Sequence, residues 1–99
     1  MPVVIIQDFP EEETERSTTN YDEISRRLQE SGAIPPEGCH LHCAGFTGQG
    51  FRIIEIWDSR EQFDRFLADH VMPLVMEMSS ADQRAPEITS YELHSLMTM

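Results

Sequence analysis

The side chains best suited to proton transfer are a histidine and a glutamate on the two arms of one predicted β-hairpin. If Gly48–Gln49 centres the turn, His42 lies directly opposite Glu55. Facing Cβ atoms in such a pair are about 5 Å apart, which allows a hydrogen bond between the side chains. A carboxylate bound to an imidazole sets its tautomer and raises its basicity, as in a general base. The sequence therefore predicts His42 as base and Glu55 as its orienting partner; a satisfied structural pair is the alternative.

Aromatic and histidine side chains elsewhere in the chain are candidates for a binding wall. The same hairpin register places His40 opposite Trp57, whose indole could stack on an aromatic ligand. We expect the substrate-binding residues to be Trp57, His40, Phe51, His70 and Tyr21. The structural alternatives are core or interface packing for Trp57 and a helix C-terminal position, favoured by the helix dipole, for His70.

The run Cys-His-Leu-His-Cys that begins at Cys39 invites a test for metal binding. In a strand, side chains alternate between faces, so Cys39 and Cys43 point one way and the two histidines the other. The four cannot converge on a tetrahedral zinc ion, and we expect no metal. A facial site from His40, His42 and Glu55 is a third option. Since no dinucleotide or phosphate motif occurs, we expect no organic cofactor.

Composition bounds the class of protein and its partners. The chain has 99 residues, which suits one domain spanning 1–99. Its net charge of −11, with no lysine, disfavours nucleic acid and anionic membranes as partners. The sequence lacks an apolar run of the ~20 residues that cross a bilayer, and it lacks a basic N-terminal leader. Cys39 and Cys43, about 13 Å apart in a strand, cannot form a disulfide, so we expect a reduced, cytoplasmic protein.

Apolar patterns predict the elements that position these side chains. Strands are expected at 3–9, 39–46, 51–58 and 88–96, and polar loops at 11–18 and 79–86. Two helices lie between them, and the order is β-α-β-β-α-β. This order predicts an α+β fold of the ferredoxin-like, split β-α-β type, in which helices cover one face of an antiparallel sheet.

Local signals mark the ends of the two helices. They are N-caps at Asn20 and Ser59, capping-box partners at Glu23 and Gln62, and a stop at Gly32. Pro73 should end or kink the second helix near His70, because proline lacks the N–H that continues a helix.

The third strand indicates that the sheet needs a partner. Ile54 and Ile56 are expected to face the helices, since alternate residues of a strand share one face. Phe51, Ile53 and Trp57 then lie on the opposite face as a large apolar patch, which monomers rarely expose to water. A two-fold related copy would cover it, so we expect a homodimer.

The segment Trp57-Asp58-Ser59-Arg60-Glu61-Gln62-Phe63 resembles the W-x-S-x-E-x-F signature of the dimeric α+β barrel superfamily, which includes the antibiotic-biosynthesis-monooxygenase-like proteins. The resemblance implies a homodimer with a pocket between sheet and helices in each protomer. Members include cofactor-independent oxygenases of aromatic polyketides, haem-degrading proteins and lactone isomerases. The oxygenases commonly use a first-strand asparagine, where this chain has Gln7. The haem-degrading proteins need a histidine where it has Leu67, which argues against haem chemistry.

Two functional hypotheses follow. The first is a small cofactor-independent enzyme, a monooxygenase, cyclase or isomerase. It would use the His42/Glu55 pair to take a proton from a hydrophobic aromatic or polyketide-like molecule. The alternative is a non-catalytic module of the same fold that binds a small molecule or another protein.

Overall fold

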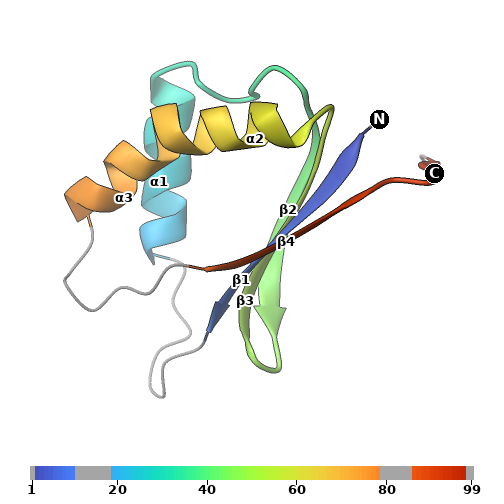
Figure 1. The fold of residues 1–99 in the computed structure, drawn as a ribbon. Helices are drawn as coiled ribbons and strands as arrows, with labels where there is room; N and C mark the ends of the chain where they lie inside the picture. Colours follow the sequence, from blue (N-terminus) through green and yellow to red (C-terminus); the bar gives the residue numbers. More distant parts are fainter. Residues whose placement is uncertain (1, 11–18, 79–85, 98–99) are drawn as a thin grey trace.

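The computed structural model describes residues 2–10, 19–78 and 86–97, so most of the predicted loops at 11–18 and 79–86 lies outside it. Its elements are β1 (Val3–Pro10), α1 (Thr19–Glu30), β2 (Cys39–Thr47), β3 (Gly50–Trp57), α2 (Arg60–Phe66), the π-helical turn η1 (Leu67–Val71), α3 (Met72–Met78) and β4 (Glu87–Glu92). The strands form one antiparallel sheet in the order β2-β3-β1-β4. The helices lie on one side of it (Figure 1). This confirms the predicted ferredoxin-like α+β fold.

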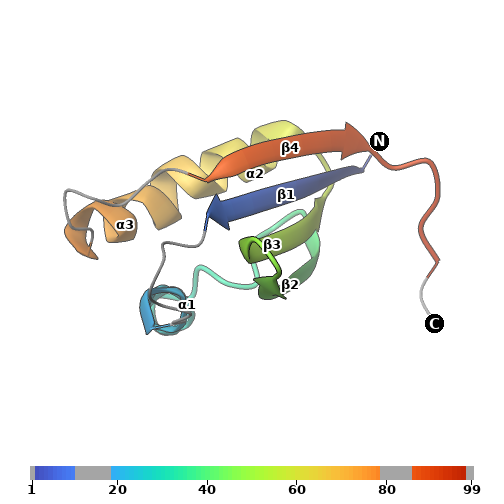
Figure 2. The same cartoon turned by 90° about the horizontal axis from the view of Figure 1, so that it is seen from below.

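The core lies between the sheet and α2. Its centre consists of Ile5, Trp57 and Phe63, each at most 1% exposed. Figure 2 shows α2 beside the sheet. Phe63 of α2 packs against Ile5 of β1 and Trp57 of β3, the two central strands. Burial of each such side chain contributes on the order of 1.5–3 kcal/mol. The core therefore fixes α2 on the two central strands of the sheet.

The prediction for the two faces of β3 is wrong. The Trp57 ring packs against Phe63 and Phe66 of α2, with centroids 6.0 and 5.6 Å apart. The aromatic set of β3 therefore faces the helices, and Ile54 and Ile56 lie on the outer face of the sheet. Both sets are apolar, so alternation defines two faces without saying which one the helices cover. The aromatic residues on α2 decide this.

Helix α1 ends at the predicted glycine but begins differently. Gly32 has a φ of +78°, and the N–H of Ala33 donates to the carbonyl of Leu28 at 2.9 Å, which closes the last turn. At the other end, Asn20 lies within the helix, which starts at Thr19, so the predicted cap position is wrong by one residue or more.

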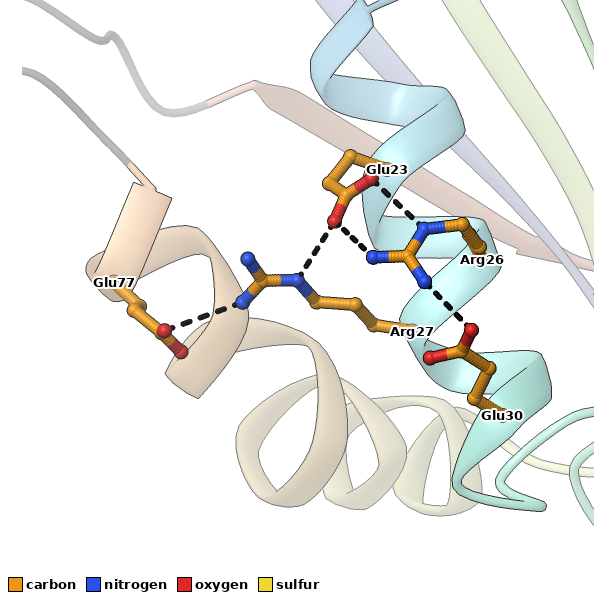
Figure 3. A network of polar contacts seen from close by, with 5 residues as sticks. All are labelled: Glu23, Arg26, Arg27, Glu30 and Glu77. Atoms are coloured by element: carbon orange, nitrogen blue, oxygen red, sulfur yellow. Dashed lines mark hydrogen bonds and ion pairs between the residues drawn. The ribbon is translucent and has the colours of Figure 1, made fainter.

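Charged side chains form ion pairs within α1 and between α1 and α3 (Figure 3). Glu23 accepts hydrogen bonds from Arg26 and Arg27, and Arg26 also reaches Glu30 at 2.6 Å. Arg27 extends to Glu77 of α3 at 3.2 Å. The two arginines lower the pKa of Glu23 to about 2. Of these contacts, the Arg27–Glu77 ion pair connects α1 to α3, and the others lie within α1.

The second helical segment continues past Pro73 instead of ending there. Ser59 caps α2 as predicted, accepting the N–H of Gln62 at 3.2 Å. The chain then stays helical to Met78 by widening into the π turn η1, in which the N–H of Met72 donates to the carbonyl of Leu67. A proline clashes with the carbonyl four residues earlier, and a wider turn relieves that clash.

Strand β4 is shorter than predicted, ending at Glu92 rather than Leu96. Among the described strands it pairs with β1 alone, and the first residue of β1, Val3, is the partner of Glu92. Beyond that point β4 has no strand to bond to, apart from one contact from the Leu93 N–H to the Pro2 carbonyl at 2.9 Å. Among the described helices, none has the length and apolar character needed to cross a membrane.

Candidate active site

The β2–β3 hairpin brings the predicted proton-transfer pair together. From Leu41 to Thr47 the register follows the prediction, with His42 opposite Glu55. The His42 Nδ1 lies 3.1 Å from the Glu55 Oε2. The two-residue turn fixes this register, and the pairs from Thr47 back to Leu41 inherit it.

The position of His40 differs from the prediction. A β-bulge between Cys39 and Leu41 makes Cys39, not His40, the partner of Trp57. The extra residue shifts the alternation by one. The His40 Nε2 instead lies 2.5 Å from Asp58, and both of these side chains are about half exposed. His40 is therefore separated from the His42 site and lies at the opposite end of the hairpin from the turn.

Glu55 is a buried carboxylate with two side-chain partners. The residue is 6% exposed, and its Oε1 accepts a hydrogen bond from the Gln7 Nε2 at 3.2 Å. Gln7, on β1, is also buried and lies diagonally across from Glu55, two residues from Ile5, the direct partner of Glu55. A buried charge is tolerated when each oxygen has a donor. Gln7 and His42 supply one donor for each oxygen.

The second nitrogen of His42 has a partner on α1. The Tyr21 hydroxyl is within hydrogen-bond distance of the His42 Nε2, and the two rings are nearly parallel, with centroids 5.9 Å apart. Burial raises the pKa of Tyr21, and Glu55 adds to this, although a hydrogen bond with Ser25 acts in the opposite sense. The Tyr21–His42–Glu55–Gln7 chain thus connects α1 through β2 and β3 to β1.

The hydrogen-bond partners fix the tautomer of His42. An ionised Glu55 can only accept, so the neutral imidazole must carry its hydrogen on Nδ1. The Nε2 then presents a lone pair and accepts from the Tyr21 hydroxyl. The His42 side chain is 42% exposed, whereas the Glu55 side chain is only 8% exposed. The imidazole is therefore the more accessible member of the pair, and its Nε2 is covered by the Tyr21 hydroxyl.

A set of aromatic rings begins at Tyr21. Phe51 makes an edge contact with Tyr21 at 5.2 Å and another with Phe46 at 5.1 Å, and Phe9 lies 6.4 Å from Phe51. Of the residues predicted to bind substrate, Tyr21 therefore contacts His42 directly, and Phe51 contacts Tyr21.

Trp57 and His70 lie in a different place. Both line a cavity of about 430 Å³ between α2, η1 and the chain that joins α1 to β2, together with Phe66 and Arg65. Trp57 itself is fully buried, in agreement with the packing alternative for it, and the exposed His70 ring lies 5.4 Å from that of Phe66. Neither His42 nor Glu55 lines this cavity. The predicted residues therefore lie in three places: Tyr21 and Phe51 on the His42 side, Trp57 and His70 at this cavity, and His40 at neither.

The predicted relation between the two cysteines changes with the bulge. Cys39 faces the helices and packs against the core, while Cys43 is exposed on the outer face. Both are free thiols. Within residues 2–10, 19–78 and 86–97, no three His, Cys, Asp or Glu side chains are grouped so as to hold a metal ion. His40, which pairs with Asp58, does not join His42 and Glu55 in a facial site.

No protein-family model matches the sequence, and no curated protein does. Solved structures match in fold. A Chloroflexus aurantiacus protein, provisionally assigned as an antibiotic biosynthesis monooxygenase, is 18% identical with a TM-score of 0.64, covering 99% of this chain and 98% of that one. SnoaB, a cofactor-independent oxygenase from Streptomyces nogalater, is 15% identical with a TM-score of 0.63 and the same coverage. A dimeric ferredoxin-like protein of unknown function from Thermobifida fusca is 16% identical with a TM-score of 0.58, covering 94% and 92%.

This chain has the fold of the antibiotic-biosynthesis-monooxygenase-like proteins. The resemblance carried by 57–63 is thus confirmed for the fold. The sequence did not predict two contacts of the candidate site, that of Gln7 with Glu55 and that of Tyr21 with His42. The polar Gln7 inside an apolar first strand was the available signal for the first, because a buried amide needs a partner.

Proposed function

We propose that this protein is a cofactor-independent enzyme that takes a proton from a hydrophobic aromatic or polyketide-like molecule, as a monooxygenase, cyclase or isomerase. The observation that carries the proposal is the hydrogen bond of His42 to the buried Glu55, which leaves the Nε2 as a base beside aromatic rings. The fold shared with SnoaB, a cofactor-independent oxygenase, supports the same class of reaction.

The proposed first step is a proton transfer to His42. The Nε2 lone pair accepts the proton of a phenol, enol or activated C–H. The electron pair of the broken bond stays on the substrate. The product is an imidazolium facing the Glu55 carboxylate and a substrate anion among apolar rings. Glu55 stabilises the positive charge, since its buried carboxylate is hydrogen-bonded to the imidazole. The anion then reacts with oxygen, closes a ring or takes its proton back at another atom.

We also propose that the protein acts as a homodimer through the outer face of its sheet. That face carries Ile54 and Ile56 beside Val4 and Ile6 of β1 and Leu41 of β2. Val4 and Ile56 are already buried within the subunit, whereas Leu41 is 42% exposed. The aliphatic set replaces the aromatic set that the sequence suggested. The dimeric protein of the same fold supports this assembly. The free thiols of Cys39 and Cys43 are consistent with the proposed cytoplasmic location.

A second candidate function is ligand binding without catalysis. It is favoured by the cavity of about 430 Å³, which is separate from His42 and is lined in part by the rings of Phe66 and His70. Such a protein would bind aromatic molecules and release them unchanged.

The test compares wild type, His42→Ala and His42→Gln on a panel of aromatic and polyketide-like substrates, followed by mass spectrometry of the products. We expect turnover by wild type and a loss of about a hundredfold or more in both variants, the usual contribution of a general base. The exposed His94→Ala is the matched control and should retain activity. Equal turnover by wild type and both His42 variants would exclude His42 as the base; binding without turnover would favour the second function.

A further inference from the structure

The contact between Tyr21 and His42 bears directly on the proposed base. A neutral imidazole has one lone pair, and on His42 this lone pair is at the Nε2. In the structure the Tyr21 hydroxyl already lies at hydrogen-bond distance from that nitrogen. A base whose lone pair accepts a hydrogen bond from a hydroxyl of the protein cannot accept a proton from a substrate until that hydroxyl moves away.

Tyr21 is held in this position by contacts other than the hydrogen bond. Its ring makes an edge contact with Phe51 and lies over the His42 ring. It belongs to the first turns of α1, which the Arg27–Glu77 ion pair links to α3. The hydrogen bond is therefore accompanied by ring contacts of Tyr21 with both Phe51 and His42.

The protonation of Tyr21 favours blocking over a relay role. Burial, together with the negative charge of Glu55, raises the pKa of the Tyr21 phenol. The phenol thus keeps its proton and donates to the Nε2, and it is a poor acid toward His42. A relay through Tyr21 would need this proton to leave readily.

We propose that Tyr21 is a specificity-determining residue whose hydroxyl occupies the place of the substrate hydroxyl on His42. This inference rests on the proposed function, in which the Nε2 is the base. A ligand gains a net hydrogen bond only if it replaces the Tyr21 hydroxyl with a better donor. The site therefore selects aromatic molecules that carry a hydroxyl more acidic than that of tyrosine, and it gives no advantage to ethers or hydrocarbons of the same shape.

The test uses Tyr21→Phe, which keeps the ring against Phe51 and removes only the hydroxyl. The probes are 4-nitrophenol, an acidic phenol, and 4-nitroanisole, its methyl ether. We expect Tyr21→Phe to bind 4-nitrophenol about two- to tenfold more tightly than wild type, the range of one net hydrogen bond. The affinity for 4-nitroanisole should not change. Tyr91→Phe removes an exposed hydroxyl on the other side of the sheet and should behave as wild type.

A ligand-free measurement accompanies the titration. The ¹⁵N shift of the His42 Nε2 should change in Tyr21→Phe because its donor is gone, and it should not change in Tyr91→Phe. An unchanged shift, or an affinity of Tyr21→Phe for 4-nitrophenol that is unmeasurable, equal to that of wild type or weaker, overturns the inference.

His42→Ala separates the inference from the proposed function. In this variant the preference for 4-nitrophenol over its ether should vanish. If the preference is lost in His42→Ala while Tyr21→Phe binds 4-nitrophenol with wild-type affinity, the inference alone is wrong. If His42→Ala keeps the full preference, His42 does not bind the hydroxyl. Both the inference and the assignment of His42 as the base are then wrong.

Discussion

Gln7 donates its side-chain amide to the buried carboxylate of Glu55, across the central strand pair of the sheet. The amide supplies one of the two side-chain donors of a charge that is almost removed from water. Glu55 in turn orients His42, so Gln7 acts on the base through another residue. It is a positioning residue of the proposed site.

Replacing Gln7 by leucine should destabilise the protein. The Glu55 Oε1 would lose its donor while remaining buried, which costs about 1–3 kcal/mol in the free energy of unfolding. Urea denaturation of Gln7→Leu against wild type measures this cost. Gln49→Leu, in the exposed hairpin turn, is the control and should unfold near the wild-type midpoint. Equal stability of Gln7→Leu and wild type would contradict the role given to this amide.

Replacing Glu55 by glutamine should impair catalysis more than folding. The amide has the same shape, but it no longer forces the hydrogen of His42 onto Nδ1, and it does not stabilise the imidazolium. We expect kcat to fall between about a hundredfold and ten-thousandfold on any substrate that the panel identifies. Asp58→Asn is the control, since its contact with His40 lies outside the site. Comparable kcat values for Glu55→Gln and wild type would remove the carboxylate from the mechanism.

The raised pKa of Tyr21 predicts a loss of stability in base. Burial is its first cause, and it favours the neutral phenol in the folded state. The unfolded chain therefore loses its proton first as the pH rises past the ordinary pKa of 10.0, and the free energy of unfolding decreases up to the folded-state pKa. Denaturation at about pH 9 and about pH 11 should show a smaller decrease for Tyr21→Phe than for wild type. The same decrease in both proteins would rule out this contribution.

A charge on the outer face should break the proposed homodimer. Leu41 is partly exposed there, beside Ile56. Leu41→Glu would bury a carboxylate without a partner in the interface, which is costly, so we expect a monomer by light scattering where wild type is dimeric. Met76→Glu places the same charge on exposed α3 and should leave the dimer intact. A monomeric wild type at micromolar concentration would refute the interface.

Local signals in the sequence predicted the elements and one register well. A two-residue turn sets the pairing of both arms of the hairpin, so the contact between His42 and Glu55 follows from the sequence alone. Gly32 and Ser59 mark helix ends by chemistry that acts within a few residues. Such features depend on nearby residues, and these are visible in the sequence.

The features that the sequence did not predict depend on residues far apart in the chain. The bulge at His40 changes the alternation without a mark in the sequence, and the contact with Asp58 that accompanies it spans 18 residues. The side of β3 that faces the helices depends on Phe63 and Phe66 of α2. The contact of Tyr21 with His42 depends on where α1 lies against the sheet.

The β-bulge also gives the two thiols opposite reactivities. Burial, with Glu55 nearby, raises the pKa of Cys39 to about 11, so its thiol stays protonated and should resist alkylation. Cys43 is open to reagent on the outer face of a lone subunit. Its labelling rate with iodoacetamide would therefore fall as subunits associate. Cys43 would thus report the association of subunits. Cys39, which should hardly label in the monomer or the dimer, would be the internal standard.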